Sequence, residues 1–77
     1  MITQSQLLWR CRRGMLELDL LLRPYAENHF QSASRELQDK FLMLLEESDQ
    51  DLQSWLVNGD KVPRPGLEDI VCRLTPQ

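Results

Sequence analysis

Apolar residues recur at three- and four-residue intervals in separate stretches of this chain, and that spacing constrains its fold more than any other feature. The clearest stretch places Leu37, Phe41, Leu44 and Leu45 along a single helical face. β-Branched residues are scarce, and no stretch alternates between apolar and polar residues as a half-buried strand does. The spacing therefore predicts an all-α protein.

Five short helices account for this pattern in a chain of 77 residues. We expect the helices at about 3–13, 15–30, 35–46, 50–58 and 66–74. Pro24 falls inside the second helix and should kink it, because proline cannot form the backbone hydrogen bond to the residue four before it. The stretch GDKVPRPG contains two prolines and two glycines and predicts a loop before the last helix. The expected fold is a compact bundle forming one domain over residues 1–77.

Several residues carry signals for helix ends and for the core. Ser34 is placed to cap the third helix, and Ser48 or Asp49 is placed to cap the fourth. Trp55 lies on the apolar edge of the fourth helix, where a large aromatic side chain should anchor the core. The last helix is expected to stop before Pro76.

The residues that usually carry chemistry are few. Cys11 and Cys72 each fall among apolar residues, so we expect two reduced, partly buried, structural thiols. His29 is expected at the surface, and a single histidine without a CxxC motif gives no zinc site of ordinary spacing. The acidic residues within 46–51 lack the ligand spacing of a calcium loop. The sequence therefore predicts no catalytic, cofactor-binding or metal-binding residue.

The net charge of −3 is distributed unevenly along the chain. Residues 1–23 carry four arginines and two acids, whereas residues 24–60 carry eight acids and two basic residues. An acidic body argues against a general binder of nucleic acid or of anionic membranes, whose affinity depends on a basic surface. No apolar run could span a membrane, and the first residues lack the pattern of a signal or transit peptide. We therefore expect a cytoplasmic protein.

Gly14 separates the first two predicted helices without any spacer. Glycine suits the left-handed position after a helix, while Arg13 and Glu17 suit the ends of the two helix dipoles. These ordinary rules for helix ends account for most of the stretch. The alternative is a binding surface, because the bare backbone of a glycine at a protruding corner lets another molecule approach closely.

The residues around Gly14 also match a known pattern. The stretch WRCRRGMLELD, followed by LL and then by DQDLQSWL, resembles the small assembly-factor family that promotes covalent flavinylation of succinate dehydrogenase, also called the flavinator family. The hallmark of that family is Arg-Gly-x-x-Glu, which is formed here by Arg13, Gly14, Met15, Leu16 and Glu17. The resemblance covers residues from about 7 to 74. Members often continue past the last helix with a charged tail, whereas this sequence ends at Gln77.

The resemblance implies a compact five-helix domain that binds another protein. The implied partner is the flavoprotein subunit of succinate dehydrogenase, and also that of the related fumarate reductase. The reaction joins the 8α-methyl carbon of FAD to a histidine of that subunit, and the assembly factor does not supply this histidine. The chain is therefore expected to be a monomeric binding protein, not an enzyme, which acts on FAD attachment without stably binding a cofactor.

The family motif also implies the residues of the contact surface. Arg13 and Glu17 would be charged contacts, Gly14 would permit close approach, and Met15 would be exposed at the tip of the corner. Trp9 either borders the same surface or packs inside the protein.

Two further expectations concern the leucines near Gly14 and an alternative function. Leu16 and Leu18 are expected in the core. Some members of the family were formerly labelled antitoxins, so the alternative function is an antitoxin or regulatory protein that sequesters a toxin partner.

Overall fold

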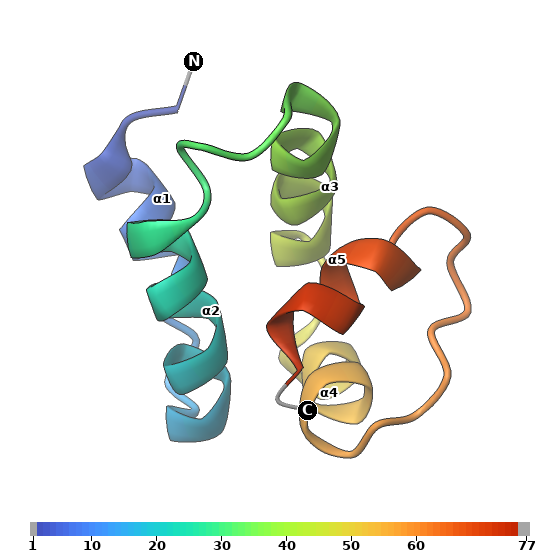
Figure 1. Cartoon of the computed structure of the whole chain (residues 1–77). Helices are drawn as coiled ribbons and strands as arrows, with labels where there is room; N and C mark the ends of the chain where they lie inside the picture. Colours follow the sequence, from blue (N-terminus) through green and yellow to red (C-terminus); the bar gives the residue numbers. More distant parts are fainter. Residues whose placement is uncertain (1, 76–77) are drawn as a thin grey trace.

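The computed structural model describes residues 2–75, and within them the protein is all-α, as the apolar spacing predicts. Its elements are α1 (Gln4–Cys11), α2 (Leu16–Asn28), α3 (Arg35–Leu45), α4 (Asp49–Leu52), the π-helix η1 (Gln53–Val57) and α5 (Glu68–Leu74). Figure 1 shows α1 and α2 side by side, with α3, α4 and α5 forming the other part of the molecule. The predicted stop of the last helix at Pro76 lies outside the described residues.

A single apolar core joins all of these elements. Phe41 is fully buried near its centre, with the rings of Tyr25 and Phe30 at centroid distances of 4.9 and 5.6 Å. Tilted aromatic pairs at such distances stabilise a core beyond the area they bury. Ser34 caps α3 by accepting a hydrogen bond from the Leu37 N–H, which confirms its predicted role.

The fourth predicted helix has two parts. Ser48, rather than Asp49, caps it, since its hydroxyl accepts from the Asp51 N–H at 3.1 Å. After Leu52 the α-helix widens into η1, which is closed by bonds that span five and six residues. In the longer bond, the Asp60 N–H donates to the Ser54 carbonyl at 2.9 Å. Because these hydrogen bonds span more than four residues, the segment is a short α-helix followed by a π-helix and not the single helix predicted over 50–58.

Helix α2 continues past Pro24 to Asn28. Proline deprives the Leu20 carbonyl of its usual helical partner. Both residues lie on the exposed side of the helix, where water can hydrate that carbonyl. The solvent side of α2 can therefore accommodate Pro24, and the kink at this position stays a prediction.

The long loop before α5 is attached to the core. Its Val62 side chain is buried, although the loop contains little other apolar surface. Arg64 in the same loop forms an ion pair with Glu47, with 3.0 Å between Nε and Oε1. Figure 1 shows this segment running along one edge of the molecule. The sequence predicted a loop here but not its buried anchor.

The two cysteines differ in their environments. Cys11 is buried, and burial raises the pKa of its thiol to about 11, so that it stays protonated at neutral pH. Cys72 is exposed, and the expectation that it is partly buried is wrong. The reason is the face of α5 that packs: Ile70, Val71 and Leu74 are buried, and Cys72 lies on the opposite side of that helix.

The two tryptophans allow a matched test of the core. Trp55 is 5% exposed, as predicted for a core anchor, whereas Trp9 is 71% exposed. We expect Trp55→Ala to lower the free energy of unfolding by about 3–5 kcal/mol, because it leaves a large cavity. Trp9→Ala should change it by less than about 0.5 kcal/mol, since an exposed side chain leaves none. Urea denaturation followed by circular dichroism gives both values, and equal losses would contradict the packing described.

Candidate partner-binding surface

The connection between α1 and α2, residues 12–15, and the first two residues of α2 form a surface, residues 12–17, that we call the α1–α2 corner. Helix α1 ends at Cys11, two residues before the predicted end. The physical reason is Asp19, whose Oδ1 accepts a hydrogen bond from the Arg13 N–H at 3.0 Å. The backbone of Arg12 is already extended, with ψ at 105°. The Asp19 carboxylate on α2 thus accepts a hydrogen bond from an N–H that could otherwise donate to a carbonyl of α1 and extend that helix.

The Arg13 side chain folds back onto the protein. It is only 17% exposed, and its Nη1 lies 3.5 Å from Oδ1 of Asp49 in the first turn of α4. Its Nε is buried and has no hydrogen-bond partner within residues 2–75. The ion pair joins the corner to a helix that lies 36 residues further along the chain. Arg13 therefore fixes the position of the corner through its side chain as well as its backbone.

Gly14 adopts the left-handed conformation predicted for it, with φ at +74°. A Cβ atom built at this position would meet no heavy atom within 4 Å. The space beside the glycine is thus open, and other residues could follow this backbone only at a conformational cost. Both properties fit a place where another molecule approaches the main chain.

The environments of Met15 and Leu16 are the reverse of those expected. Met15, predicted at the exposed tip, is half-buried against the core, whereas Leu16, predicted in the core, is 73% exposed. Met15 precedes the helix with extended backbone, and α2 begins only at Leu16. Leu18 is buried as predicted, and Leu16 lies about 160° away from it around a helix with 3.6 residues per turn. The start of the helix therefore decides which leucine faces solvent.

Glu17 projects from the first turn of α2. Its side chain is exposed and takes part in no ion pair among the described residues. No side chain caps α2, so the first amides of this helix lack a side-chain acceptor. Glu17 lies in the first turn, near the positive end of the helix dipole. The carboxylate is therefore available to a partner.

Trp9 belongs to the surface, which excludes the alternative that it packs inside the protein. The guanidinium carbon of Arg12 lies 5.7 Å from the centroid of the indole ring, at a distance typical of a cation–π contact. An exposed tryptophan next to the corner extends the apolar part of this surface along α1.

The sequence interpretation missed Asp19 and Asp49, which hold the corner in place. Asp19 lies inside the quoted stretch, and its position in the first turns of a helix was a usable signal. Asp49 is far from Arg13 in the sequence, and no local spacing connects the two residues.

The side chains that could hold a metal ion are dispersed in the described part of the chain. No group of three or more metal-ligating side chains occurs within residues 2–75. His29 lies at the surface, as expected, next to Tyr25 at a ring-centroid distance of 5.8 Å. No helix in the described part of the chain is long and apolar enough to cross a membrane.

The fold is that of a small all-α protein within the described residues. Residues 5–76 match the family described as "Flavinator of succinate dehydrogenase", and the chain belongs to that family. The resemblance inferred from the motif is thereby confirmed. The family is one of assembly factors, not of enzymes.

Curated relatives agree with this assignment. The chain is 38% identical over 71 residues to the FAD assembly factor SdhE of Vibrio cholerae, covering 92% of this chain and 83% of the relative. It is 41% identical over 66 residues to the FAD assembly factor SdhE of Shewanella oneidensis, covering 86% and 80%. The protein of the same name from Legionella pneumophila is 43% identical over 68 residues, covering 88% and 85%.

The ion pair between Arg13 and Asp49 can be tested against a neighbouring carboxylate. Asp49 and Asp51 both lie in the first turn of α4, but only Asp49 contacts Arg13. We expect Asp49→Asn to lower the free energy of unfolding by about 1 kcal/mol more than Asp51→Asn, because the mostly buried guanidinium loses its partner. Both variants remove a carboxylate that interacts favourably with the positive end of the same helix dipole, so the difference between them measures the ion pair. Equal values in urea denaturation would show that the contact does not hold the corner.

Proposed function

We propose that this chain binds the flavoprotein subunit of succinate dehydrogenase and promotes the covalent attachment of FAD to it. The surface used is the α1–α2 corner, with Trp9 at its edge. Glu17 contacts the partner directly. Because Gly14 has no side chain, the backbone of the partner, or the residues around its FAD site, can approach the main chain here. Arg13 acts by fixing the corner, and its exposed portion adds positive charge to the surface, while the half-buried Met15 beside it adds apolar area.

The observation that carries this proposal is the exposed Glu17, without an ion pair in residues 2–75, on a corner that is fixed by Asp19 of α2 and Asp49 of α4. A preorganised surface loses little conformational entropy on binding, so its contacts contribute more to affinity. The relatives named above are called FAD assembly factors, which favours this function over the antitoxin alternative.

The proposal also covers the location, the oligomeric state and the partners of the chain. The chain acts as a cytoplasmic monomer, binds no cofactor stably itself, and also serves the flavoprotein subunit of fumarate reductase. The histidine that bonds to FAD comes from the partner.

Glu17→Ala tests this function directly. As a helix-end charge, Glu17 is worth at most about 1 kcal/mol, so the variant should fold. As a partner contact, its loss should reduce covalent FAD on the flavoprotein by roughly tenfold or more, since unpairing a desolvated charge commonly costs 2–5 kcal/mol of binding. The readout is flavin fluorescence of the denatured subunit from cells that lack the native factor and express the variant.

The matched control for this experiment is Glu46→Ala. Glu46 is exposed at the end of α3 and takes part in no ion pair among the described residues. The control removes the same charge and should leave FAD attachment near the wild-type level. Normal attachment with folded Glu17→Ala would remove Glu17 from the proposed interface.

Two substitutions of Gly14 separate backbone strain from steric block. Both Gly14→Ala and Gly14→Arg place a side chain at φ +74°, which costs roughly 1–2 kcal/mol of stability in each case. Only arginine extends far into the open space where the partner is proposed to approach. We expect similar melting temperatures for the two variants and FAD attachment that is lost only with arginine. Equal attachment with both folded variants would contradict close approach at this glycine.

A further inference from the structure

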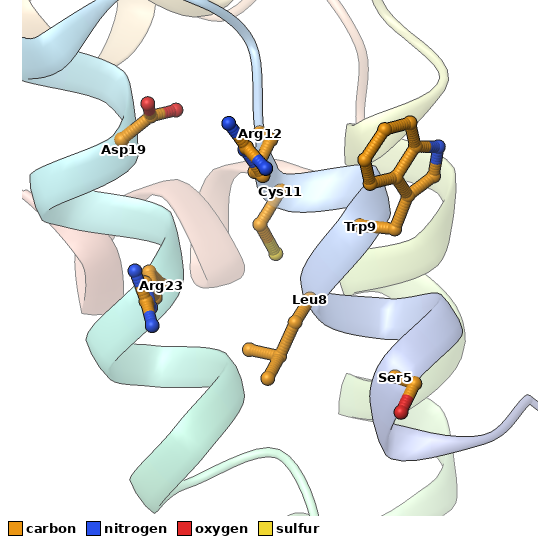
Figure 2. A pocket seen from close by; sticks show the side chains of 7 residues that line it. All are labelled: Ser5, Leu8, Trp9, Cys11, Arg12, Asp19 and Arg23. Atoms are coloured by element: carbon orange, nitrogen blue, oxygen red, sulfur yellow. The ribbon is translucent and has the colours of Figure 1, made fainter.

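A groove of about 640 Å³ lies between α1 and α2, next to the corner. Figure 2 shows the side chains that line it: Leu8 and Cys11 lie toward α2, and Trp9 projects at the outer edge of α1. Asp19 and Arg23 come from α2. The groove thus has an apolar floor, one aromatic edge and charged side chains along its length.

Two of the three charged side chains that line this groove are arginines, and both can bind a further carboxylate. Arg12 forms no ion pair among the described residues, and its guanidinium lies over the face of Trp9. Arg23 donates from Nε to Oε1 of Glu27 at 2.8 Å, and its side chain is 65% exposed, so its terminal N–H groups can donate to another carboxylate. The one acid in the groove, Asp19, already accepts the Arg13 N–H. Arg10, beside Trp9 in the adjoining hollow, adds a second cation without an ion pair in residues 2–75.

The exposed indole marks the apolar part of the groove. Tryptophan and arginine are the residue types that most often carry the binding energy of protein interfaces. Trp9 combines a large apolar surface with a cation held over its face, an arrangement suited to an apolar side chain flanked by carboxylates. Such a pattern is more typical of peptide recognition than of a small-molecule site, because the groove is open along its length.

We propose that this groove binds an acidic segment of the flavoprotein subunit, one that carries carboxylates on either side of an apolar or aromatic side chain. The apolar side chain lies against Leu8 and Trp9, and the carboxylates meet Arg12 and Arg23. This inference rests on the proposed function, because it takes the flavoprotein as the partner. It extends the contact surface from the corner along the α1–α2 groove and assigns the charge of the segment that fills it.

The two tryptophans provide a direct probe. A chain labelled with 5-fluorotryptophan has two ¹⁹F resonances, one from exposed Trp9 and one from buried Trp55. Titration with the purified flavoprotein subunit should shift or broaden the Trp9 resonance beyond the general broadening seen for Trp55. A Trp9 resonance that changes no more than that of Trp55 in the complex would overturn the proposal. A shift that appears when the labelled chain alone is concentrated would instead assign the groove to a second copy and also overturn it.

Charge reversal tests the chemistry of the segment. Arg12→Glu should weaken the complex by roughly tenfold or more, and the loss should shrink as salt is raised, because the contact is electrostatic and lies near the surface. Arg35→Glu is the matched control, since Arg35 is an exposed arginine on α3 without an ion pair in the described residues. It changes the net charge equally and should weaken binding by no more than about twofold. Equal losses for the two variants, or tighter binding with Arg12→Glu, would overturn the proposal.

The same measurements separate this inference from the proposed function. If the wild-type chain neither binds the flavoprotein nor raises its covalent FAD, the proposed function fails. If the wild-type chain does both, while folded Arg12→Glu and Trp9→Ala bind as tightly as wild type, the groove assignment fails together with the place of Trp9 and Arg12 in the contact surface, whereas the function proposed for the chain stands. Both side chains are exposed, so the variants should retain the wild-type melting temperature.

Discussion

The hydrogen bond from the Arg13 N–H to the Asp19 carboxylate is the contact on which the rest of the surface depends. It ends α1 at Cys11 and takes the chain through an extended residue into the left-handed Gly14. The Arg13 N–H therefore bonds to α2 instead of extending α1, and Leu18, next to Asp19, is fully buried. The carboxylate thus joins the corner to the first turns of the second helix.

The two charged residues of the motif have different tasks in this arrangement. Arg13 points inward, mostly buried, and pairs with Asp49 across the molecule, whereas Glu17 points outward and is unpaired within the described residues. Three helices thus cooperate to hold a short stretch of main chain in one conformation. Rigid support of this kind is what a binding surface needs if its few contacts are to act together. In this motif, Arg13 stabilises the corner through contacts inside the protein, and Glu17 is the residue available to a partner.

Much of the fold could be predicted because its signals are local. The spacing of Leu18 and Leu22, the cap at Ser34 and the buried position of Trp55 each depend on residues a few positions apart. The positions of Met15 and Leu16 could not be derived in the same way, because they depend on the residue at which α2 begins. The ion pair of Arg13 with Asp49 depends on how distant helices pack, which no spacing in the sequence expresses. The motif located the surface, but not the division of roles within it.

Hydrogen exchange of the backbone amides tests the central claim most directly, namely that the α1–α2 corner is the surface that meets the flavoprotein. The amides at the start of α2 have no side-chain cap, so they should exchange rapidly in the free chain. On addition of the flavoprotein subunit lacking FAD, we predict slower exchange in peptides covering 12–20 and unchanged exchange in peptides covering 35–45. Slower exchange confined to 35–45, with 12–20 unchanged in a saturated complex, would contradict the account.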